Sequence, residues 1–335
     1  MVKTKYLFIT NSTGYSHKRV CDPFIDYFGE DIELLRLSPK SNPVVIIQNI
    51  FYLGNFILKN RIKIKKVIVV GDLFYIGLFF KKKAAYIFDF NILKDASRNR
   101  SIFTKLAFRF KCVYPLYFYD ELFFFNKMIE DEYKDICFEK KNKQLVYLPV
   151  PIHPSFYPLM NYSELLFNEK KEKIRNGKLS VICFGHTENK NLEMALRICQ
   201  ELSNKFSLCV NVVNDKFNIC DRFNNIQINR YSDIKDAEII ELYKKSNILL
   251  FPSLYEGFGM PIIEAAVSQC LVVTSDLFPM NSLLNSAVLI NLSGDISVNI
   301  AAIEEGIKNY NNLAINGFKE AMEYHVRKIN KLLLY

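Results

Sequence analysis

Two glutamates eight positions apart bracket a short glycine-containing segment in the second half of the chain. Glu256 and Glu264 stand in Phe251-Pro-Ser-Leu-Tyr-Glu-Gly-Phe-Gly-Met-Pro-Ile-Ile-Glu-Ala265, directly after an apolar run typical of a buried strand. A helix is predicted after Gly257-Phe258-Gly259, because proline at Pro261 is tolerated in a first turn. The free N–H groups and dipole of such a helix start favour a diphosphate, whereas carboxylates accept hydrogen bonds from hydroxyl groups. A sugar nucleotide carries both a diphosphate and hydroxyl groups.

The elements that position this segment follow an alternating pattern. Short β-branched or aromatic runs alternate with longer amphipathic segments, which is typical of βαβ units. Strands are predicted at 6–10, 32–37, 67–70, 84–88, 145–148, 180–184, 208–213, 226–229, 248–251, 271–275 and 288–291, and helices at 191–204, 236–246, 260–268 and 296–310. The aromatic region 113–125 is ambiguous between strand and helix.

The length and the prolines predict two domains. The chain has 335 residues, and four prolines between Pro149 and Pro158 are followed by a charged segment. Proline blocks helix continuation and central-strand pairing, so a linker is expected there. We predict a Rossmann-like domain at 1–155, a linker at 156–178, a second Rossmann-like domain at 179–312 and a C-terminal segment at 313–335 that forms a helix packed back on the first domain. Ligands bind beyond the carboxyl ends of parallel strands, so the site is expected in a cleft between the two domains.

Charge is distributed unevenly between the halves. Residues 1–155 carry 25 basic and 15 acidic groups, and residues 156–335 carry 19 and 20, so the halves are +10 and −1. Basic residues between Lys59 and Lys66 and at Lys81–Lys83, beside Phe79 and Phe80, suit an anionic membrane surface. An ordinary solvated face is the alternative. No nucleic acid is expected as a partner, because no recognition motif accompanies the charge.

The cysteine and acidic residues indicate in which compartment the protein works and whether it binds a metal ion. The eight cysteines form no Cys-x-x-Cys pair and no transmembrane or signal segment is predicted, so we expect reduced thiols and a cytoplasmic location, with the inner face of the membrane as an alternative. No Asp-x-Asp motif is present. The acidic residues 130–132 with Asp135 have helical spacing and are expected on a solvated face, so no metal and no other cofactor is predicted.

The glutamate segment resembles the signature of the retaining glycosyltransferases of family 4, which have the two-domain GT-B fold. That signature is a Glu, seven residues and a second Glu around Gly-Phe-Gly, preceded by Pro-Ser. Further resemblances are Phe184-Gly185-His186 with Lys190-Asn191-Leu192, Glu241-Leu242-Tyr243, and Val272-Val273-Thr274-Ser275-Asp276. They cover about residues 180–295, and the first half matches only in architecture.

The resemblance implies roles for individual residues. Glu256 would contact the donor sugar near the reacting carbon, Glu264 the ribose hydroxyls, and Lys190 the diphosphate leaving group. Donor contacts are also expected at His186, Gly257, Phe258, Gly259, Met260 and Gly14.

Three departures from the family pattern fall on or beside candidate site residues. His186 follows Gly185 where the family has Arg, the loop after the first strand is reduced to Thr13-Gly14-Tyr15-Ser16, and Phe88 precedes Asp89 where many members have His. Asp89 is a candidate catalytic residue, with helix capping as the alternative.

These patterns predict a retaining, metal-independent enzyme that moves a sugar from a nucleotide-sugar donor to a glycan acceptor, with a lipid-linked surface polysaccharide or lipopolysaccharide as one candidate. The alternative is a catalytically weak GT-B protein that acts as a binding or scaffolding subunit. A dehydrogenase is not favoured, because neither half shows G-x-G-x-x-G after its first strand.

Overall fold

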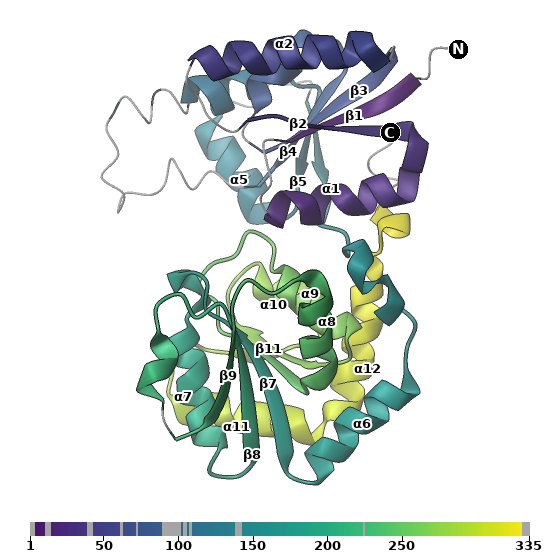
Figure 1. The fold of residues 1–335 in the computed structure, drawn as a ribbon. Coiled ribbons are helices and arrows are strands. Elements are labelled where there is room, and N and C mark those ends of the chain that lie inside the picture. Colours follow the sequence, from purple (N-terminus) through teal and green to yellow (C-terminus); the bar gives the residue numbers. More distant parts are fainter. Residues whose placement is uncertain are drawn as a thin grey trace. The chain divides into compact units, whose positions relative to one another are not determined.

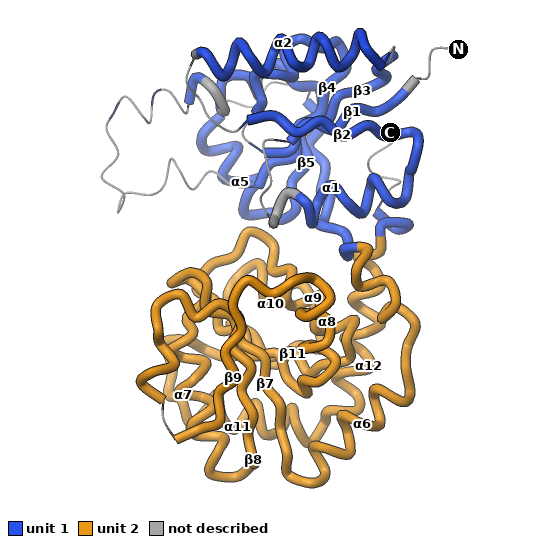
Figure 2. The backbone as a smooth tube through the Cα atoms, in the orientation of Figure 1, with its two compact units in different colours: residues 1–153, 326–335 blue, residues 154–325 orange. Residues whose placement is uncertain are grey.

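The computed structural model describes residues 4–10, 15–38, 43–60, 63–71, 73–88, 102, 106, 109–137, 143–223 and 225–329. The chain divides into two compact units (Figure 2), residues 1–153 with 326–335 and residues 154–325. The chain therefore passes from one unit to the other twice. No described helix is long and apolar enough to cross a bilayer.

Unit 1 is built on six parallel strands in the order β2-β1-β3-β4-β5-β6. The strands are β1 (Thr4–Thr10), β2 (Ile32–Arg36), β3 (Lys63–Val70), β4 (Lys83–Ile87), β5 (Glu121–Phe124) and β6 (Gln144–Tyr147). Its helices include α1 (Tyr15–Phe28), α2 (Pro43–Asn60) and α5 (Lys127–Ile136). The ambiguous aromatic region resolves into a π turn at Arg109–Val113, a 3₁₀ turn at Tyr114–Phe118 and then β5.

Unit 2 has the strand order β12-β11-β10-β7-β8-β9, again all parallel. Its strands are β7 (Lys178–Phe184), β8 (Ser207–Val213), β9 (Gln227–Tyr231), β10 (Ile248–Phe251), β11 (Leu271–Ser275) and β12 (Val288–Ile290). Its helices are α6 (Glu164–Arg175), α7 (Leu192–Leu202), α8 (Asp236–Lys245), α9 (Met260–Val267), α10 (Met280–Leu283), α11 (Ile296–Lys308) and α12 (Tyr310–Ala321), labelled in Figure 1.

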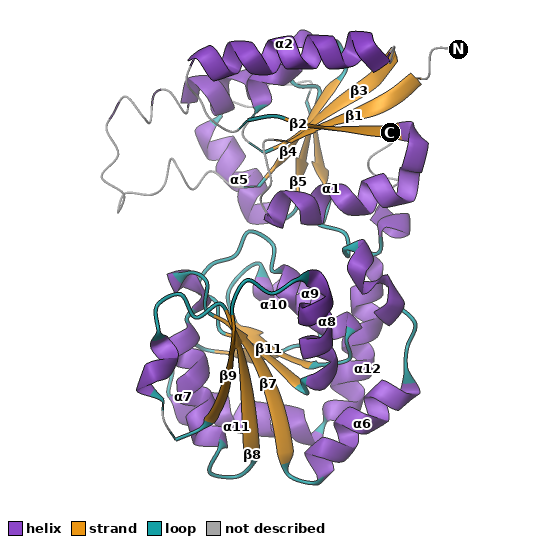
Figure 3. Cartoon of the chain, viewed as in Figure 1, coloured by secondary structure: helices purple, strands orange, loops and turns teal. Residues whose placement is uncertain are grey.

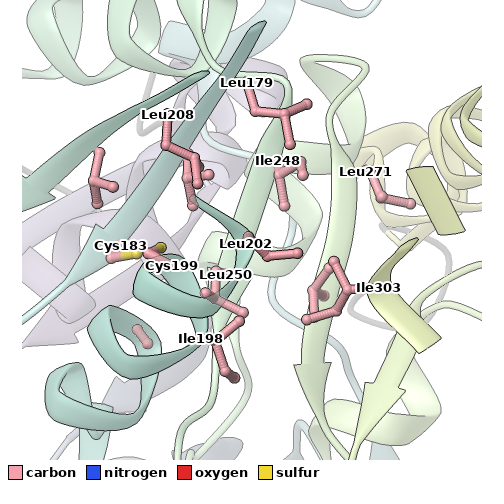
Figure 4. Close-up of a cluster of buried hydrophobic side chains, with 14 of the residues drawn as sticks. Leu179, Cys183, Ile198, Cys199, Leu202, Leu208, Ile248, Leu250, Leu271 and Ile303 are labelled. Atoms are coloured by element: carbon pink, nitrogen blue, oxygen red, sulfur yellow. The ribbon is translucent and has the colours of Figure 1, made fainter. Parts of the chain in front are cut away.

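The core of unit 2 lies between the sheet and helices α7 and α11. Leu179, Val181 and Cys183 alternate along β7 with residues of the other face, as the period of two in a strand requires. They pack against Ile198 and Cys199 of α7, and Figure 4 shows this cluster. Burying each such aliphatic side chain contributes about 1.5–3 kcal/mol, which holds β7 and its carboxyl end in place.

Three sequence expectations about elements need correction. Residues 156–178, expected as a linker, contain helix α6, which begins after the N-cap Ser163 and belongs to unit 2. The Ser163 hydroxyl accepts from the Leu166 amide at 3.2 Å, a cap that the charged composition concealed. The acidic face of α5 is not wholly solvated, because Glu132 is 4% exposed. At the C-terminus, α12 ends at Ala321 within unit 2, and residues from Val326 group with unit 1.

Candidate functional site

The site predicted from the sequence lies at the point where the winding of the unit 2 sheet reverses. Strands β7 and β10 are neighbours there, although β8 and β9 separate them in the chain. In open parallel sheets ligands bind beyond the carboxyl ends of the strands at such a switch point. The segment after β7 carries Lys190, and the segment after β10 carries Glu256 and the start of α9.

Lys190 and Glu256 form a buried ion pair at this edge. Lys190 Nζ lies 2.5 Å from Glu256 Oε1, and the two side chains are 7% and 11% exposed. The same ammonium group lies 4.9 Å from the centroid of the Phe251 ring, a cation–π distance. A buried charge is costly unless it is paired, so removing either partner would leave an uncompensated charge in the site.

The loop that carries Lys190 is tied to the loop that carries Glu256. Lys190 closes a 3₁₀ turn, Glu188–Lys190, and Asn191 then adopts a left-handed conformation with φ of 51°, which Asn tolerates better than most residues. The Leu254 amide donates to the Asn189 carbonyl at 2.7 Å, and Asn189 Nδ2 donates to the Tyr255 carbonyl at 2.6 Å. These hydrogen bonds, one between backbone groups and one from the Asn189 side chain, hold the two loops together without using the charges of the ion pair.

Ser253 completes the support of Glu256. Its hydroxyl lies 2.6 Å from Glu256 Oε1, and Ser275 Oγ donates to the Ser253 carbonyl at 2.6 Å. Sequence reasoning noted the Pro-Ser dipeptide but did not place Ser253 in the site. The signal was its position three residues before Glu256, immediately beyond a strand end.

Glycine is required where the chain enters α9. Gly259 has φ of 101°, a conformation that other residues rarely adopt. A Cβ atom there would lie 2.9 Å from Leu283 Cδ1. Gly185, at the end of β7, is equally restricted, because its Cβ would meet Leu192 Cδ2 at 2.6 Å and the Asn214 carbonyl at 3.2 Å. Both positions let the backbone approach its neighbours closely at the switch point.

Glu264 lies inside α9 and is 7% exposed. Its Oε2 accepts a hydrogen bond from the Tyr243 hydroxyl at 3.2 Å. Tyr243 is fully buried and packs edge-on against Phe156, with ring centroids 5.9 Å apart. Tyr243 belongs to the Glu-Leu-Tyr run noted in the sequence, yet its contact with Glu264 could not be read there, because 21 positions separate them.

His186 lies at the surface after β7. Partial desolvation, with the positive charges of Lys190 and Lys216, lowers the pKa of His186 to about 4. The imidazole is therefore neutral near pH 7 and offers a donor and an acceptor rather than a cation. Beside it, a pocket of about 270 Å³ is lined by residues that include Gly185, Thr187 and Phe217.

The remaining sequence-predicted residues are placed as follows. Gly257 and Met260 flank the turn into α9, but the Phe258 ring points inward, being 6% exposed and packed edge-on against Tyr324. Asp89 and Gly14 lie outside the described residues. Within the described ranges, no three His, Cys, Asp or Glu side chains are grouped as ligands of a metal ion would be.

A family model matches the part of the chain that holds most of the site. Residues 166–319, a little under half of the chain, match the model of the family described as glycosyl transferases group 1. This range contains all the site residues described above except those of unit 1.

Curated relatives match over a short stretch. The O-antigen chain mannosyltransferase RfbU of Salmonella typhimurium is 34% identical over 86 residues, which is 24% of each chain. The serotype-specific mannosyltransferase WbdA of Escherichia coli is 37% identical over 79 residues, which is 23% of this chain and 10% of WbdA. The aligned stretches thus span a quarter or less of the length of these relatives.

Solved structures match over nearly the whole chain. Sucrose-phosphate synthase from Thermosynechococcus elongatus has a TM-score of 0.72 at 12% identity, covering 99% of this chain and 97% of that one. WaaG, a glycosyltransferase involved in lipopolysaccharide biosynthesis, has a TM-score of 0.64 at 12% identity, covering 95% and 94%. The fold is therefore GT-B, the two-domain α/β fold that the sequence predicted.

Proposed function

We propose that this protein is a retaining, metal-independent glycosyltransferase that moves a sugar from a nucleotide-sugar donor to a glycan acceptor. The observation that carries the proposal is the buried pair of Lys190 and Glu256 at the switch point, 2.5 Å apart. A sugar diphosphate carries negative phosphate groups and sugar hydroxyls, and the nearly buried cation and carboxylate can bind these two kinds of group. The cation meets the phosphate charge, and the carboxylate meets the sugar hydroxyls.

Donor binding would divide this ion pair. Lys190 would turn to the diphosphate, where the dipole at the start of α9 also favours negative charge. Glu256, still supported by Ser253, would accept hydrogen bonds from the sugar. Positioned charges of this kind stabilise a developing diphosphate anion, an electrostatic role that usually dominates catalysis.

Glu264 would hold the ribose. Its carboxylate accepts a hydrogen bond from Tyr243, and we propose that it also accepts hydrogen bonds from the ribose hydroxyls. In the transfer itself, the bond between the anomeric carbon and the diphosphate oxygen breaks. The acceptor oxygen bonds to that carbon on the same face, and the acceptor proton leaves with the diphosphate product.

The acceptor is proposed to be a lipid-linked glycan of surface polysaccharide synthesis. RfbU and WbdA are mannosyltransferases by name, and RfbU acts on an O-antigen chain, so a mannosyl donor is the first candidate to test. We place the protein in the cytoplasm, at the inner face of a membrane.

Helix α2 supports the membrane part of this proposal. Its exposed side carries apolar residues mostly three or four positions apart, which we call the α2 stripe: Val44, Ile47, Phe51, Tyr52 and Leu58, each between 54% and 77% exposed. The helix runs along the outside of unit 1 (Figure 1). Exposed lysines follow at Lys59, Lys63 and Lys65, whereas Lys66 is buried against Glu121 and does not contribute. An apolar stripe beside lysines is typical of a helix that lies in a membrane interface.

The donor site is tested by thermal shift of the purified protein with UDP, GDP, ADP, CMP and their common sugar conjugates, with and without EDTA. Selective stabilisation by one base, unchanged by EDTA, is expected, and a ligand at 100 times its dissociation constant adds about 2.7 kcal/mol. Sensitivity to EDTA would contradict the metal-independent reaction. The absence of any response would favour the catalytically weak binding subunit.

The α2 stripe is tested separately by sedimentation with vesicles that contain an anionic phospholipid. We expect the wild type to sediment at low salt and Phe51→Ser/Tyr52→Ser to remain in the supernatant. Leu165→Ser/Val298→Ser is the matched control, because these side chains are 72% and 65% exposed on unit 2. Equal sedimentation of both variants would remove α2 from membrane binding while leaving the donor site untouched.

A further inference from the structure

The sheet of unit 2 has a polar face that the donor site does not use. On β8 and β9 the residues facing away from the core include Cys209, Asn211, Gln227, Asn229 and Tyr231, and Ser180 continues this row on β7. Residues with the opposite phase, such as Leu208 and Val210, lie in the core. A strand whose two faces differ this sharply in polarity is typical of a sheet covered on one side only.

Figure 3 agrees with this pattern. Helices α7 and α11 lie on the far side of the strands, and no described helix covers β8 and β9 on the near side. Helix α8 contributes Leu242 and Lys245 to the edge of this polar face, and α6 contributes Lys173. The result is a pocket of about 520 Å³ over the three strands, within the usual size of a small-molecule site.

The polar groups in this pocket are held in place. Asn211 is only 4% exposed, and its Nδ2 donates to Ser180 Oγ at 3.1 Å. Its Oδ1 accepts from Asn229 Nδ2 at 3.1 Å. Preorganised amides bind hydroxyl groups without the cost of ordering side chains. Gln227 adds an exposed amide, and the partly buried Tyr231 ring adds an apolar surface beside a hydroxyl. Fixed amides next to an aromatic ring suit a sugar, which has hydroxyls at its edge and C–H groups on its faces.

The pocket is also positively charged. Lys173, Lys178 and Lys245 line it, all three are exposed, and none of its lining residues is acidic. In the described part of the chain these lysines form no ion pair within 4.0 Å, and Lys173 Nζ donates only to the Lys245 carbonyl, at 3.3 Å. Lys173 and Lys178 also line a neighbouring depression, which contains Glu169 and Glu172. Three lysines around one pocket favour an anionic ligand.

We propose that this pocket is a second saccharide site, which binds an acidic sugar unit that carries a carboxylate or a phosphate. It is distinct from the donor site. Ser180 lies near the start of β7 and Lys190 lies beyond its end, and the four steps from Ser180 to Phe184 alone span about 13 Å. Given the proposed function, the site would hold a unit of the glycan away from the reacting end.

The test is calorimetric titration of the whole chain, without donor, with digalacturonic acid as the acidic probe, mannobiose as the neutral one and tripolyphosphate as an anion that is not a sugar. We expect digalacturonic acid to bind most tightly. Lys178→Glu/Lys245→Glu should weaken it at least about tenfold, as loss of hydrogen bonds to charged groups implies. Asn229→Leu should weaken it as well. Lys308→Glu/Lys319→Glu carries the same change in charge on exposed positions of unit 2 and should leave it unchanged.

Four results would overturn the proposal. No heat from digalacturonic acid at millimolar concentration would remove the site. If mannobiose bound as tightly as digalacturonic acid, the pocket would not recognise charge. If tripolyphosphate bound as tightly as digalacturonic acid, and Asn229→Leu did not weaken it, the pocket would not recognise a sugar. Loss of nucleotide stabilisation in Lys178→Glu/Lys245→Glu would assign the pocket to the donor site. Since probe binding is measured without donor or turnover, failure here is distinguishable from failure of the proposed transferase activity.

Discussion

Lys190 and Glu256, 66 positions apart in the chain, meet at 2.5 Å beyond the ends of two adjacent strands. Each is nearly buried, and the carboxylate oxygen that faces the ammonium group also receives the Ser253 hydroxyl, at 2.6 Å. The pair is balanced in charge before any ligand arrives. A diphosphate that binds there must compete with Glu256 for Lys190.

This competition makes the Glu256→Gln variant informative. We expect sugar transfer to fall about 100-fold or more, as for the loss of one preorganised group that stabilises the transition state. Nucleoside diphosphate binding should be retained or strengthened, because Lys190 is released from its carboxylate partner. Transfer rates and calorimetric affinities measured side by side check both effects. Lys190→Ala is the control, in which nucleotide affinity should fall instead, and an unchanged transfer rate in Glu256→Gln would exclude Glu256 from the mechanism.

Substitutions of Glu264 and Tyr243 should distinguish direct binding of the ribose from positioning of the Glu264 carboxylate. Glu264→Ala removes the acceptor of the ribose hydroxyls and should weaken nucleotide binding by about 1.5–3 kcal/mol. Tyr243→Phe keeps the carboxylate but removes the hydroxyl contacts with Glu264 at 3.2 Å and with the Pro261 carbonyl at 3.5 Å, and it should cost about 1 kcal/mol or less. Fluorescent-nucleotide displacement would measure the two affinities. If Tyr243→Phe weakened binding as strongly as Glu264→Ala, the tyrosine rather than the glutamate would be the main contact.

The lowered pKa of His186 predicts that nucleotide affinity depends on pH. Its pKa in the free protein is lowered to about 4, and a bound diphosphate nearby would raise it, so binding would be coupled to uptake of a proton. Affinity for the nucleotide should therefore increase as the pH falls toward 4, more steeply in the wild type than in His186→Gln. The difference between the two proteins cancels the titration of the phosphate itself. Parallel pH profiles would show that His186 does not contact the diphosphate.

The lowered pKa of His186 also makes the free energy of unfolding depend on pH. The pKa of His186 is lower in the folded than in the unfolded chain, where it is about 6.5, so the unfolded chain binds more protons between pH 4 and 6.5. Stability without ligand should thus decrease as the pH falls through that window, and less so in His186→Gln. Chemical denaturation at several pH values would measure both.

Lys170 should contribute to stability rather than to binding. Its fully buried ammonium donates to the Tyr243 carbonyl at 2.9 Å and the Ser268 carbonyl at 2.6 Å, near the ends of α8 and α9. Lys170→Met leaves these carbonyls unsatisfied and should cost about 1–3 kcal/mol of unfolding free energy near neutral pH.

The pH profile of this variant provides a check. Burial lowers the pKa of Lys170, so between the folded pKa and 10.5 the unfolded chain binds more protons and stability rises with pH. The wild type should gain stability over Lys170→Met as the pH increases through that window. A difference that shrinks with rising pH would contradict a charged, buried lysine.

The fold class and most strands could be predicted from the sequence, because parallel strands bury both faces and read as short apolar runs. The strand predicted at 248–251 has the bounds of β10, and the helix predicted at 260–268 corresponds to α9, which ends at Val267. Local signals also located the glutamates, the turn at Gly259 and the Lys-Asn helix start. The sequence predicts a linker where helix α6 lies, because the charged residues of α6 resemble a solvated segment and its contacts near the ends of α8 and α9 are distant in sequence.

Only the tertiary structure decided which of these residues act together. Strand order is set by pairing across the sheet, not by position in the chain, so the adjacency of β7 and β10 could not be read from local patterns. That adjacency brings Lys190 to Glu256, and the packing of α8 on α9 brings Tyr243 to Glu264. Likewise, the sequence shows alternating polar residues on β8 and β9, but only the folded sheet shows that no described helix covers them and that they line a pocket.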